Sequence, residues 1–95
     1  MPLLNSMKKD KPWFVYMLRC NDGSIYTGIS NYVEDRIKEH NSGEGAKYTA
    51  SRSPVTLIFQ EKHPDKSAAF KREIQIKTWS KVRKEALSKI KSSRD

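Results

Sequence analysis

Five side chains of this sequence together have the chemistry that cleavage of a phosphodiester needs. Tyr16 and Tyr26 lie ten residues apart, and Arg36 and His40 follow at a spacing of four. Glu73 comes much later, as a lone acid in an apolar and basic segment. A phenol or an imidazole can accept a proton, a guanidinium can stabilise charge on a phosphorane, and a carboxylate can hold a divalent ion. We therefore take these residues as candidates for a small metal-dependent active site.

A catalytic tyrosine needs a partner, because the pKa of a free phenol is about 10. A neighbouring cation, metal or imidazole must take or share its proton. Arg36 and His40 are the candidates, and His40, with a reference pKa of about 6.5, is the better base on its own. The competing interpretation makes Tyr16 and Tyr26 a cross-strand aromatic pair that stabilises a hairpin, and makes His40 an ordinary surface residue of a helix.

Arg36 and Glu73 also have both a chemical and a structural interpretation. Arg36 can donate planar, bidentate hydrogen bonds to phosphate oxygens, or it can form an exposed pair with Glu39 or Asp35. Glu73 lies at the border of the apolar stripe of its helix, where it can hold an ion or pair with Lys77 at i+4. A single carboxylate suits Mg²⁺, which keeps several waters and accepts a phosphate oxygen as ligand.

The charge of the chain favours an anionic partner. Nineteen Lys and Arg against eleven Asp and Glu leave a formal net charge of +8, a balance shared by proteins that bind nucleic acid, although ribosomal and membrane-surface proteins fit it too. We expect nucleic acid to contact the helix residues Lys71 and Lys77, for which a solvated helix face is the alternative. We also expect contacts from Lys47, Tyr48 and Arg52, in a predicted loop whose small residues allow close approach and stacking.

Two predicted strands position the phenols. The run Trp13 to Cys20 is aromatic and β-branched with little alternation, which predicts a central strand covered on both faces. Ile25 to Ser30 predicts a second strand. Between them, Asn21-Asp22-Gly23 predicts a type I turn with Gly23 in the left-handed conformation, as in a bulged three-residue hairpin loop.

The length of that loop decides which way the phenols point. If Cys20 pairs with Ser24, Tyr26 lies opposite Leu18 and diagonal to Tyr16, so both phenols share one face of the sheet. A two-residue Asp-Gly loop would place them on opposite faces. The Asn-Asp-Gly sequence favours the shared face.

A helix is predicted over residues 32–41. Asn31 and Glu34 resemble a capping box at its start, and Asn-Ser-Gly after His40 is a stop signal. Arg36 and His40 are one turn apart, so they should point the same way from a rigid support.

The remaining elements complete an α+β arrangement in the order ββαβαα. Val55 to Glu61 predicts a third strand, which most simply pairs with the first and makes Trp13 to Cys20 the central strand. Residues 64–67 open a helix that is predicted to run through Trp79 and to continue, bent, to Ile90.

Ninety-five residues are enough for one domain and too few for two independent cores. We predict a disordered leader over 1–11, a single domain over 12–91 and a short tail over 92–95. Cys20 is the only cysteine, which excludes an internal disulfide or a thiolate zinc cluster and favours a cytoplasmic location. The leader has too few apolar residues for a signal peptide, and no apolar run approaches the roughly 20 residues of a membrane span.

The joint pattern of motifs resembles the GIY-YIG nuclease superfamily, in particular its small single-domain bacterial members. Val15-Tyr16-Met17 stands at the family's Gly-Ile-Tyr element, and Tyr26-Thr27-Gly28 stands at its Tyr-Ile-Gly element. Arg36 matches the family's helix arginine, His40 its His-or-Tyr position, and Glu73 its metal-binding glutamate. The likeness covers nearly the whole domain, and the joint spacing is more specific than any single element.

The resemblance implies a three-stranded antiparallel sheet flanked by helices, and an endonuclease that cleaves one DNA strand with one divalent ion, Mg²⁺ or Mn²⁺. It also implies that Tyr16 or Tyr26 prepares the attacking water with His40, that Arg36 steadies the phosphorane, and that an ion at Glu73 stabilises the leaving 3′ oxygen.

Two departures from the family keep a second interpretation open. Ile29 stands where repair-type members often carry a lysine, and no added DNA-binding domain is present. The first hypothesis is a structure- or weakly sequence-selective DNA endonuclease of DNA repair or processing, acting as a monomer or with a protein partner that supplies specificity. The second is a non-catalytic nucleic-acid-binding protein that keeps the scaffold. A third, an adaptor with an apolar helix face at Trp79, Val82, Leu87 and Ile90, is disfavoured because a small domain needs such a face for its own core.

Overall fold

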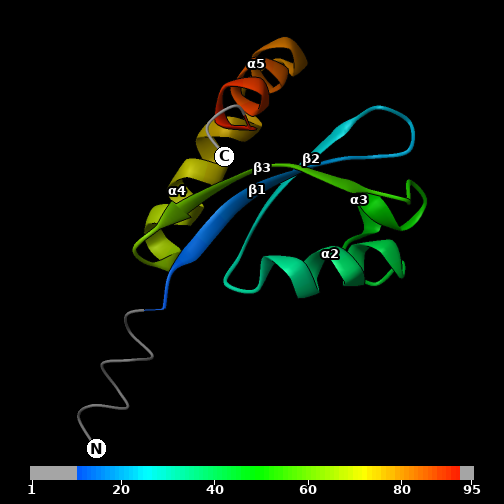
Figure 1. Cartoon of the computed structure of the whole chain (residues 1–95), viewed down its shortest axis with the longest axis horizontal. Coiled ribbons are helices and arrows are strands. Elements are labelled where there is room, and N and C mark those ends of the chain that lie inside the picture. The colour runs from blue at the N-terminus through cyan, green and yellow to red at the C-terminus, as the bar shows by residue number, and fades with distance from the viewer. Residues whose placement is uncertain (1–10, 93–95) are drawn as a thin grey trace, which may run out of the picture.

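The chain forms a three-stranded antiparallel sheet in the order β2-β1-β3, with helices on both faces. The structure, a computed structural model, describes residues 11–92, so the predicted leader and tail lie almost entirely outside it. The elements are β1 (Trp13–Arg19), β2 (Ile25–Ser30), α2 (Val33–Asn41), α3 (Lys47–Ala50), β3 (Thr56–His63), α4 (Lys66–Lys77) and α5 (Lys81–Ser92). Figure 1 shows α2 and α3 on one side of the sheet, and α4 and α5 on the other. The predicted fold class and the central position of β1 are confirmed.

The hairpin between β1 and β2 has the predicted three-residue loop. The Cys20 amide donates to the Ser24 carbonyl at 2.8 Å, and the Gly23 amide donates to the Cys20 carbonyl at 2.9 Å. Gly23 has φ of +86°, the left-handed conformation that glycine adopts at little cost. The register places Tyr26 opposite Leu18. Tyr16 and Tyr26 therefore share one face of the sheet, as predicted.

Each face of β1 builds a separate apolar cluster, because successive side chains of a strand point to opposite sides. Val15 and Met17 pack with Phe59 of β3 and with Ala69 and Ile76 of α4. The opposite face joins Tyr16, Leu18, Cys20, Val33 and Val55. All four central residues of β1 are fully or almost fully buried, which is why this strand lacks the alternation of a half-exposed one.

Two predictions about helix α2 and the segment after it were wrong. Tyr32, not Asn31, occupies the N-cap position of α2, and it makes no side-chain capping bond. Its amide is instead accepted by the Ser30 hydroxyl at 2.8 Å. The segment predicted as a loop contains the short helix α3, so the element order is ββααβαα. Asn41, at the end of α2, is joined to the residue just before β3. Its side chain accepts from the Val55 amide at 2.6 Å and donates to the Val55 carbonyl at 3.3 Å.

The C-terminal region contains two helices, as in the predicted order, and the expected bend is a break between Lys77 and Lys81. Asp65 caps α4 by accepting the Ala68 amide at 2.9 Å, as the predicted start requires. The helix ends where the Thr78 hydroxyl donates to the Gln75 carbonyl at 2.7 Å, and the Ser80 hydroxyl accepts the Arg83 amide at the start of α5. Side-chain hydroxyls thus satisfy backbone groups at both ends of the break.

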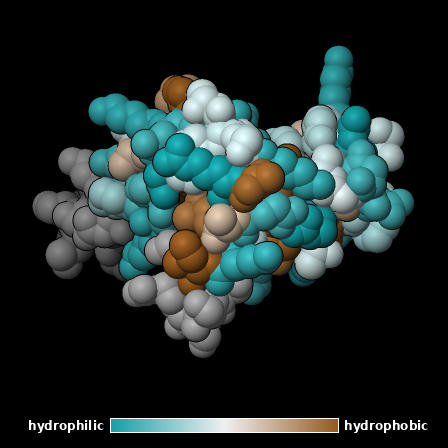
Figure 2. Space-filling view, turned by 90° about the horizontal axis from the view of Figure 1, so that it is seen from above, coloured by the Kyte–Doolittle hydropathy of each residue, from teal (hydrophilic) through white to brown (hydrophobic). Residues whose placement is uncertain are grey.

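The apolar face of the C-terminal region is only partly buried. Trp79 and Leu87 pack against the core, whereas 79% of Val82 and 62% of Ile90 is exposed, so the prediction that this whole face is core was wrong. Figure 2 shows hydrophobic groups scattered among hydrophilic ones on the face it presents. Within residues 11–92, no helix has the length and apolar character that crossing a bilayer requires.

Candidate active site

Three of the predicted site residues meet in direct contact between the sheet and α2. The hydroxyl of Tyr16 lies 2.8 Å from Nε2 of His40. The imidazole is tilted against the ring of Tyr26 at a centroid distance of 4.9 Å, and the two phenol rings are 6.3 Å apart. Tyr16 and His40 are buried, so His40 is not the ordinary surface residue of the competing interpretation.

Two glycines make room for this cluster. A Cβ on Gly28 would lie 2.8 Å from the Tyr16 hydroxyl oxygen and 3.0 Å from a ring carbon of Tyr26. A Cβ on Gly45 would lie 2.5 Å from Nδ1 of His40. Real Cβ atoms do not approach neighbours this closely, so any side chain at either position would displace a phenol or the imidazole. The glycine of Tyr26-Thr27-Gly28 is therefore a steric requirement of the site.

Thr49 of α3 contacts the other side of the imidazole. Its hydroxyl lies 2.8 Å from Nδ1 of His40 and donates to the Ala46 carbonyl at 3.2 Å. The side chain is fully buried. Sequence reasoning missed this residue, because one threonine in a polar segment has no periodic or motif signal.

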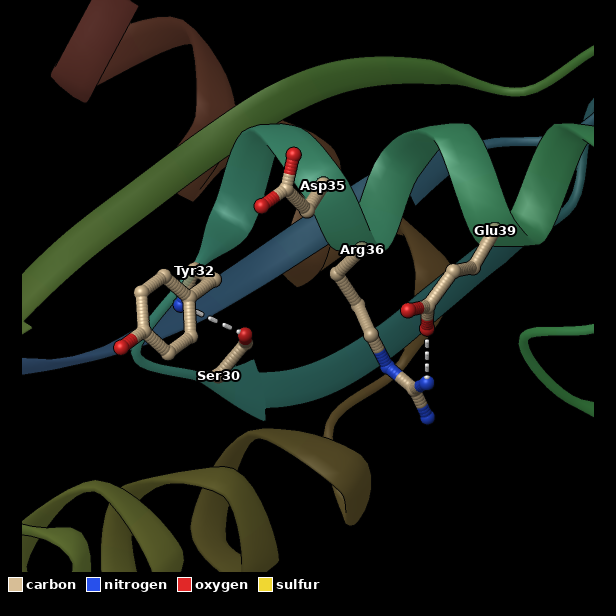
Figure 3. Close-up of a pocket in the computed structure, with 5 residues that line it drawn as sticks. All are labelled: Ser30, Tyr32, Asp35, Arg36 and Glu39. Atoms are coloured by element: carbon tan, nitrogen blue, oxygen red, sulfur yellow. Dashed lines mark hydrogen bonds and ion pairs between the residues drawn. The ribbon is translucent and has the colours of Figure 1, made fainter.

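Arg36 lies at the edge of the cluster and is held by its own helix. It donates to the Glu39 carboxylate at 2.6 Å and to the Gly45 carbonyl at 2.9 Å. Figure 3 shows the guanidinium projecting from α2 at a pocket of about 300 Å³, which Ser30, Tyr32, Asp35 and Glu39 also line. Arg36 thus forms the pair that the structural interpretation predicted, and it also borders an open pocket.

Glu73 lies on α4 and, like Arg36, is paired with a charged residue of its own helix. Only 9% of the residue is exposed, and its carboxylate lies 3.3 Å from Nζ of Lys77. Glu73 does not contact the phenols, but its charge acts on Tyr16. No group of three or more His, Cys, Asp or Glu in the described part of the chain could hold a metal. One largely buried carboxylate fits a Mg²⁺ ion that takes its other ligands from water and substrate.

Burial shifts the two central titrating groups in opposite directions. It raises the pKa of Tyr16 to about 12, with Tyr26 and Glu73 adding to the effect and Arg36 opposing it. Burial and the charge of Arg36 lower the pKa of His40, against a smaller opposing effect of Glu39. At neutral pH, Tyr16 is therefore a phenol and His40 an uncharged imidazole, which is the form that can accept a proton.

The residues predicted to contact nucleic acid lie in two places, in or just after α3 and on α4. Tyr48 stacks on Tyr26 at a centroid distance of 6.1 Å, and Arg52 lies 4.0 Å from the Tyr48 ring centroid. Arg52 also donates to Asp22 at 3.0 Å, which ties α3 to the hairpin loop. Lys47 is exposed on α3, whereas Lys71 and Lys77 are exposed on α4.

Ile29 lies away from the phenols. It packs against the core cluster that contains Val15 and Met17, on the α4 side of the sheet. Strand alternation places its side chain on the face of the sheet opposite to that of Tyr26. An aliphatic residue at this position therefore leaves the face that carries the phenols unchanged.

Comparisons with known proteins agree with this geometry. The family model described as the GIY-YIG catalytic domain matches residues 12–86. A UPF0213 protein of Staphylococcus epidermidis is 52% identical over 71 residues, which cover 75% of this chain and 87% of that protein. A UPF0213 protein of Staphylococcus aureus is 50% identical over 76 residues, which cover 80% and 93%. The solution NMR structure of a UPF0213 protein from Bacillus halodurans superposes with a TM-score of 0.55 at 44% identity, covering 84% of this chain and 85% of that one.

Proposed function

Since this chain belongs to the GIY-YIG catalytic-domain family, a nuclease family, we propose that it is an endonuclease that hydrolyses phosphodiester bonds in DNA. The observation that carries the proposal is the buried hydrogen bond of 2.8 Å between Tyr16 and an uncharged His40. The proposed enzyme uses one Mg²⁺ or Mn²⁺ ion, is structure- or weakly sequence-selective, and acts in DNA repair or processing in the cytoplasm. The proposed catalytic domain spans residues 12–91.

The pKa directions favour a proton relay over a free phenolate. With the pKa of Tyr16 at about 12 and that of His40 lowered, a separated phenolate and imidazolium is costly. The attacking water can instead give a proton to Tyr16 Oη while Tyr16 gives its own proton to His40 Nε2. Hydroxide character then develops at the water as it attacks phosphorus, and the leaving 3′ oxygen takes up a proton from solvent water. After the products leave, His40 gives its proton back to Tyr16 and Tyr16 passes its own proton to water, so both groups return to their starting state.

Arg36 and Glu73 complete the proposed site. When a phosphodiester enters the pocket beside Arg36, the guanidinium can exchange Glu39 for the non-bridging oxygens, where negative charge develops. Glu73, with waters, would hold the divalent ion, which supplies stabilisation of charge on the leaving 3′ oxygen when bound. The products are a 5′ phosphate and a 3′ hydroxyl.

Nicking of supercoiled plasmid DNA tests this proposal. We expect wild-type protein to nick with Mg²⁺ or Mn²⁺ and to stop when EDTA is added. Arg36→Ala should lower the rate by on the order of 10²-fold or more, by analogy with the loss of a transition-state donor. Glu73→Ala should remove the metal-dependent activity. Glu34→Ala, which removes an exposed acid of α2, is the matched control and should nick like wild type. Equal residual nicking by wild type and Glu73→Ala would mark the activity as contamination.

A non-catalytic nucleic-acid-binding protein is the second candidate. It is favoured by the net charge of +8 and by the intramolecular pairing of both Arg36 and Glu73. It predicts binding that weakens steeply with ionic strength, through counterion release, without metal-dependent cleavage. Folded protein that binds plasmid in this manner but never nicks it would favour this candidate over the endonuclease.

A further inference from the structure

The hydrogen bonds around His40 form one buried chain. In order, they join the Ala46 carbonyl, the Thr49 hydroxyl, the His40 imidazole and the Tyr16 hydroxyl. Tyr16, His40 and Thr49 are each no more than 1% exposed. Because these side chains are almost fully buried, bulk water does not act as their hydrogen-bond partner. The direction of each bond in the chain therefore follows from the hydrogens that the groups carry.

Counting those hydrogens selects one tautomer of His40. The Thr49 hydroxyl has a single hydrogen, and it donates this hydrogen to the Ala46 carbonyl at 3.2 Å. Towards His40 the same oxygen can only accept, so Nδ1 must carry the hydrogen. A neutral imidazole has one N–H, which leaves the lone pair of Nε2 facing Tyr16 and accepting from its hydroxyl.

The opposite tautomer leaves the buried Tyr16 hydroxyl without an acceptor. If Nε2 carried the hydrogen, it would donate to Tyr16, whose own hydrogen would then need another acceptor. The nearby guanidinium of Arg36 offers none, because arginine has donors only. Thr49 would turn its hydrogen to Nδ1, and the Ala46 carbonyl would keep its bond of 3.0 Å from the Ala50 amide. The cost of this tautomer therefore falls on the buried Tyr16 hydroxyl, and a buried donor without an acceptor is unfavourable.

We propose that Thr49 is a positioning residue that fixes His40 in the tautomer with hydrogen on Nδ1, so that Nε2 can accept the proton of Tyr16. The tautomer itself is inferred from three hydrogen bonds. Its use in a proton relay rests on the proposed function. Thr49 touches neither the substrate nor the water in this scheme. It determines which nitrogen of the relay is free, since the partner of one ring nitrogen sets the protonation of the other.

Nitrogen-15 NMR of the His40 ring in the wild-type protein tests the tautomer without any activity. We expect the signature of a protonated Nδ1 and an unprotonated Nε2 near neutral pH. The opposite signature in folded wild-type protein would overturn the proposal, whether or not the protein cleaves DNA. An expected signature in a protein that never nicks DNA would support the tautomer and count against the proposed function alone.

Two substitutions separate positioning from packing. Thr49→Val keeps the shape but removes the acceptor, so hydrogen should move to Nε2 and nicking should slow by on the order of 10²-fold. Thr49→Ser loses a methyl but keeps the hydroxyl, and should retain both the wild-type tautomer and most of the rate. Thr56→Val, at an exposed position of β3, is the control. An unchanged tautomer in Thr49→Val, or equal losses in the serine and valine variants, would contradict the proposal. If the valine variant does not fold, the wild-type spectrum and the serine variant still decide.

Discussion

The two faces of β1 pack against very different partners. On the α4 side, Val15 and Met17 pack with Phe59, Ala69 and Ile76 in an apolar cluster. On the α2 side, the residue between them, Tyr16, joins a cluster that also carries a buried imidazole and a buried threonine hydroxyl. The same seven-residue strand therefore supports a scaffold on one face and a hydrogen-bonded chain on the other.

The two faces of β1 should tolerate different kinds of substitution. An apolar cluster depends on volume and shape, so substitutions that leave cavities reduce its stability. A buried polar chain depends on the number and direction of its hydrogens, so an isosteric change can alter its chemistry while the fold persists. Stability and activity should therefore respond to different substitutions on the two sides of β1.

Among substitutions in β1 itself, removing the Tyr16 hydroxyl should have the largest effect on activity. Tyr16→Phe keeps the ring but ends the relay to His40, so the single-turnover nicking rate should fall by about 10²–10⁴-fold. Unfolding by urea should shift only modestly, by about 1 kcal/mol for one lost hydrogen bond. Thr56→Val, which removes the hydroxyl of an exposed residue of β3, is the control and should keep the wild-type rate. Equal rates in the two variants would remove Tyr16 from the mechanism.

A cavity on the α4 face should produce the largest loss of stability. Ile76 is fully buried, so Ile76→Ala should lower the free energy of unfolding by about 2–5 kcal/mol. Half of Ile74, on the same helix, is exposed, and Ile74→Ala should change the free energy of unfolding by no more than about 0.5 kcal/mol. Urea denaturation measures both. The folded fraction of Ile76→Ala should nick at nearly the wild-type rate, and a rate loss like that of Tyr16→Phe would show that the two faces are not independent.

The pH dependence of stability should come in part from the α2 face. Because the pKa of His40 in the folded protein lies below its unfolded value, the unfolded chain binds the proton first as the pH falls. Stability is therefore highest above the ordinary histidine pKa of about 6.5 and decreases as the pH falls from there toward the lower folded value. We expect His40→Gln to lack this part of the slope in urea titrations at several pH values.

The α4 face contributes in a more acidic window. Burial opposes the shift at Glu61, but hydrogen bonds from Arg72 and His63 lower its pKa. Its stabilising effect is thus present above the unfolded glutamate pKa and is lost as the pH falls through the folded one. A slope near neutral pH that survives in His40→Gln would assign that window to a group other than the buried imidazole.

The smallest expected effect concerns the charged rim. Lys47→Gln, on α3, should weaken DNA binding and reduce the slope of log affinity against log salt by about one, as for the loss of one phosphate contact. Lys81→Gln removes the same charge from an exposed position at the start of α5 and should leave the slope unchanged. Binding titrations at several salt concentrations measure both. Equal changes would indicate that DNA does not distinguish the two sides of the sheet.

Local signals in the sequence were enough to predict the position of the phenols. The turn Asn21-Asp22-Gly23 defines the loop length by its own backbone requirements, and that length fixes the register that puts Tyr16 and Tyr26 on one face. The apolar run of β1 likewise indicates burial on both faces. These features are predictable because each depends on residues close together in the chain.

Features that depend on tertiary partners were not predictable in this way. Helix α3 has four residues, too few for a periodic pattern, and so the role of Thr49 becomes visible only when α3 lies beside His40. The pairing of Arg52 with Asp22 joins residues thirty positions apart. Such contacts form only when the chain is packed, and local propensities do not predict them.

The pairing of Arg36 with Glu39 and of Glu73 with Lys77 affects which ions can compete for the site. Each partner is attached to the same helix, three or four residues away, and so is present at a high effective concentration. A free chloride or sulfate ion lacks this tether, and simple salts should therefore be poor occupants of the site. Under the proposed function, a polynucleotide would also bind lysines outside the site, and this multivalent attachment would let it replace the internal counter-ions. We expect the resting protein to disfavour small anions and to accept a long one.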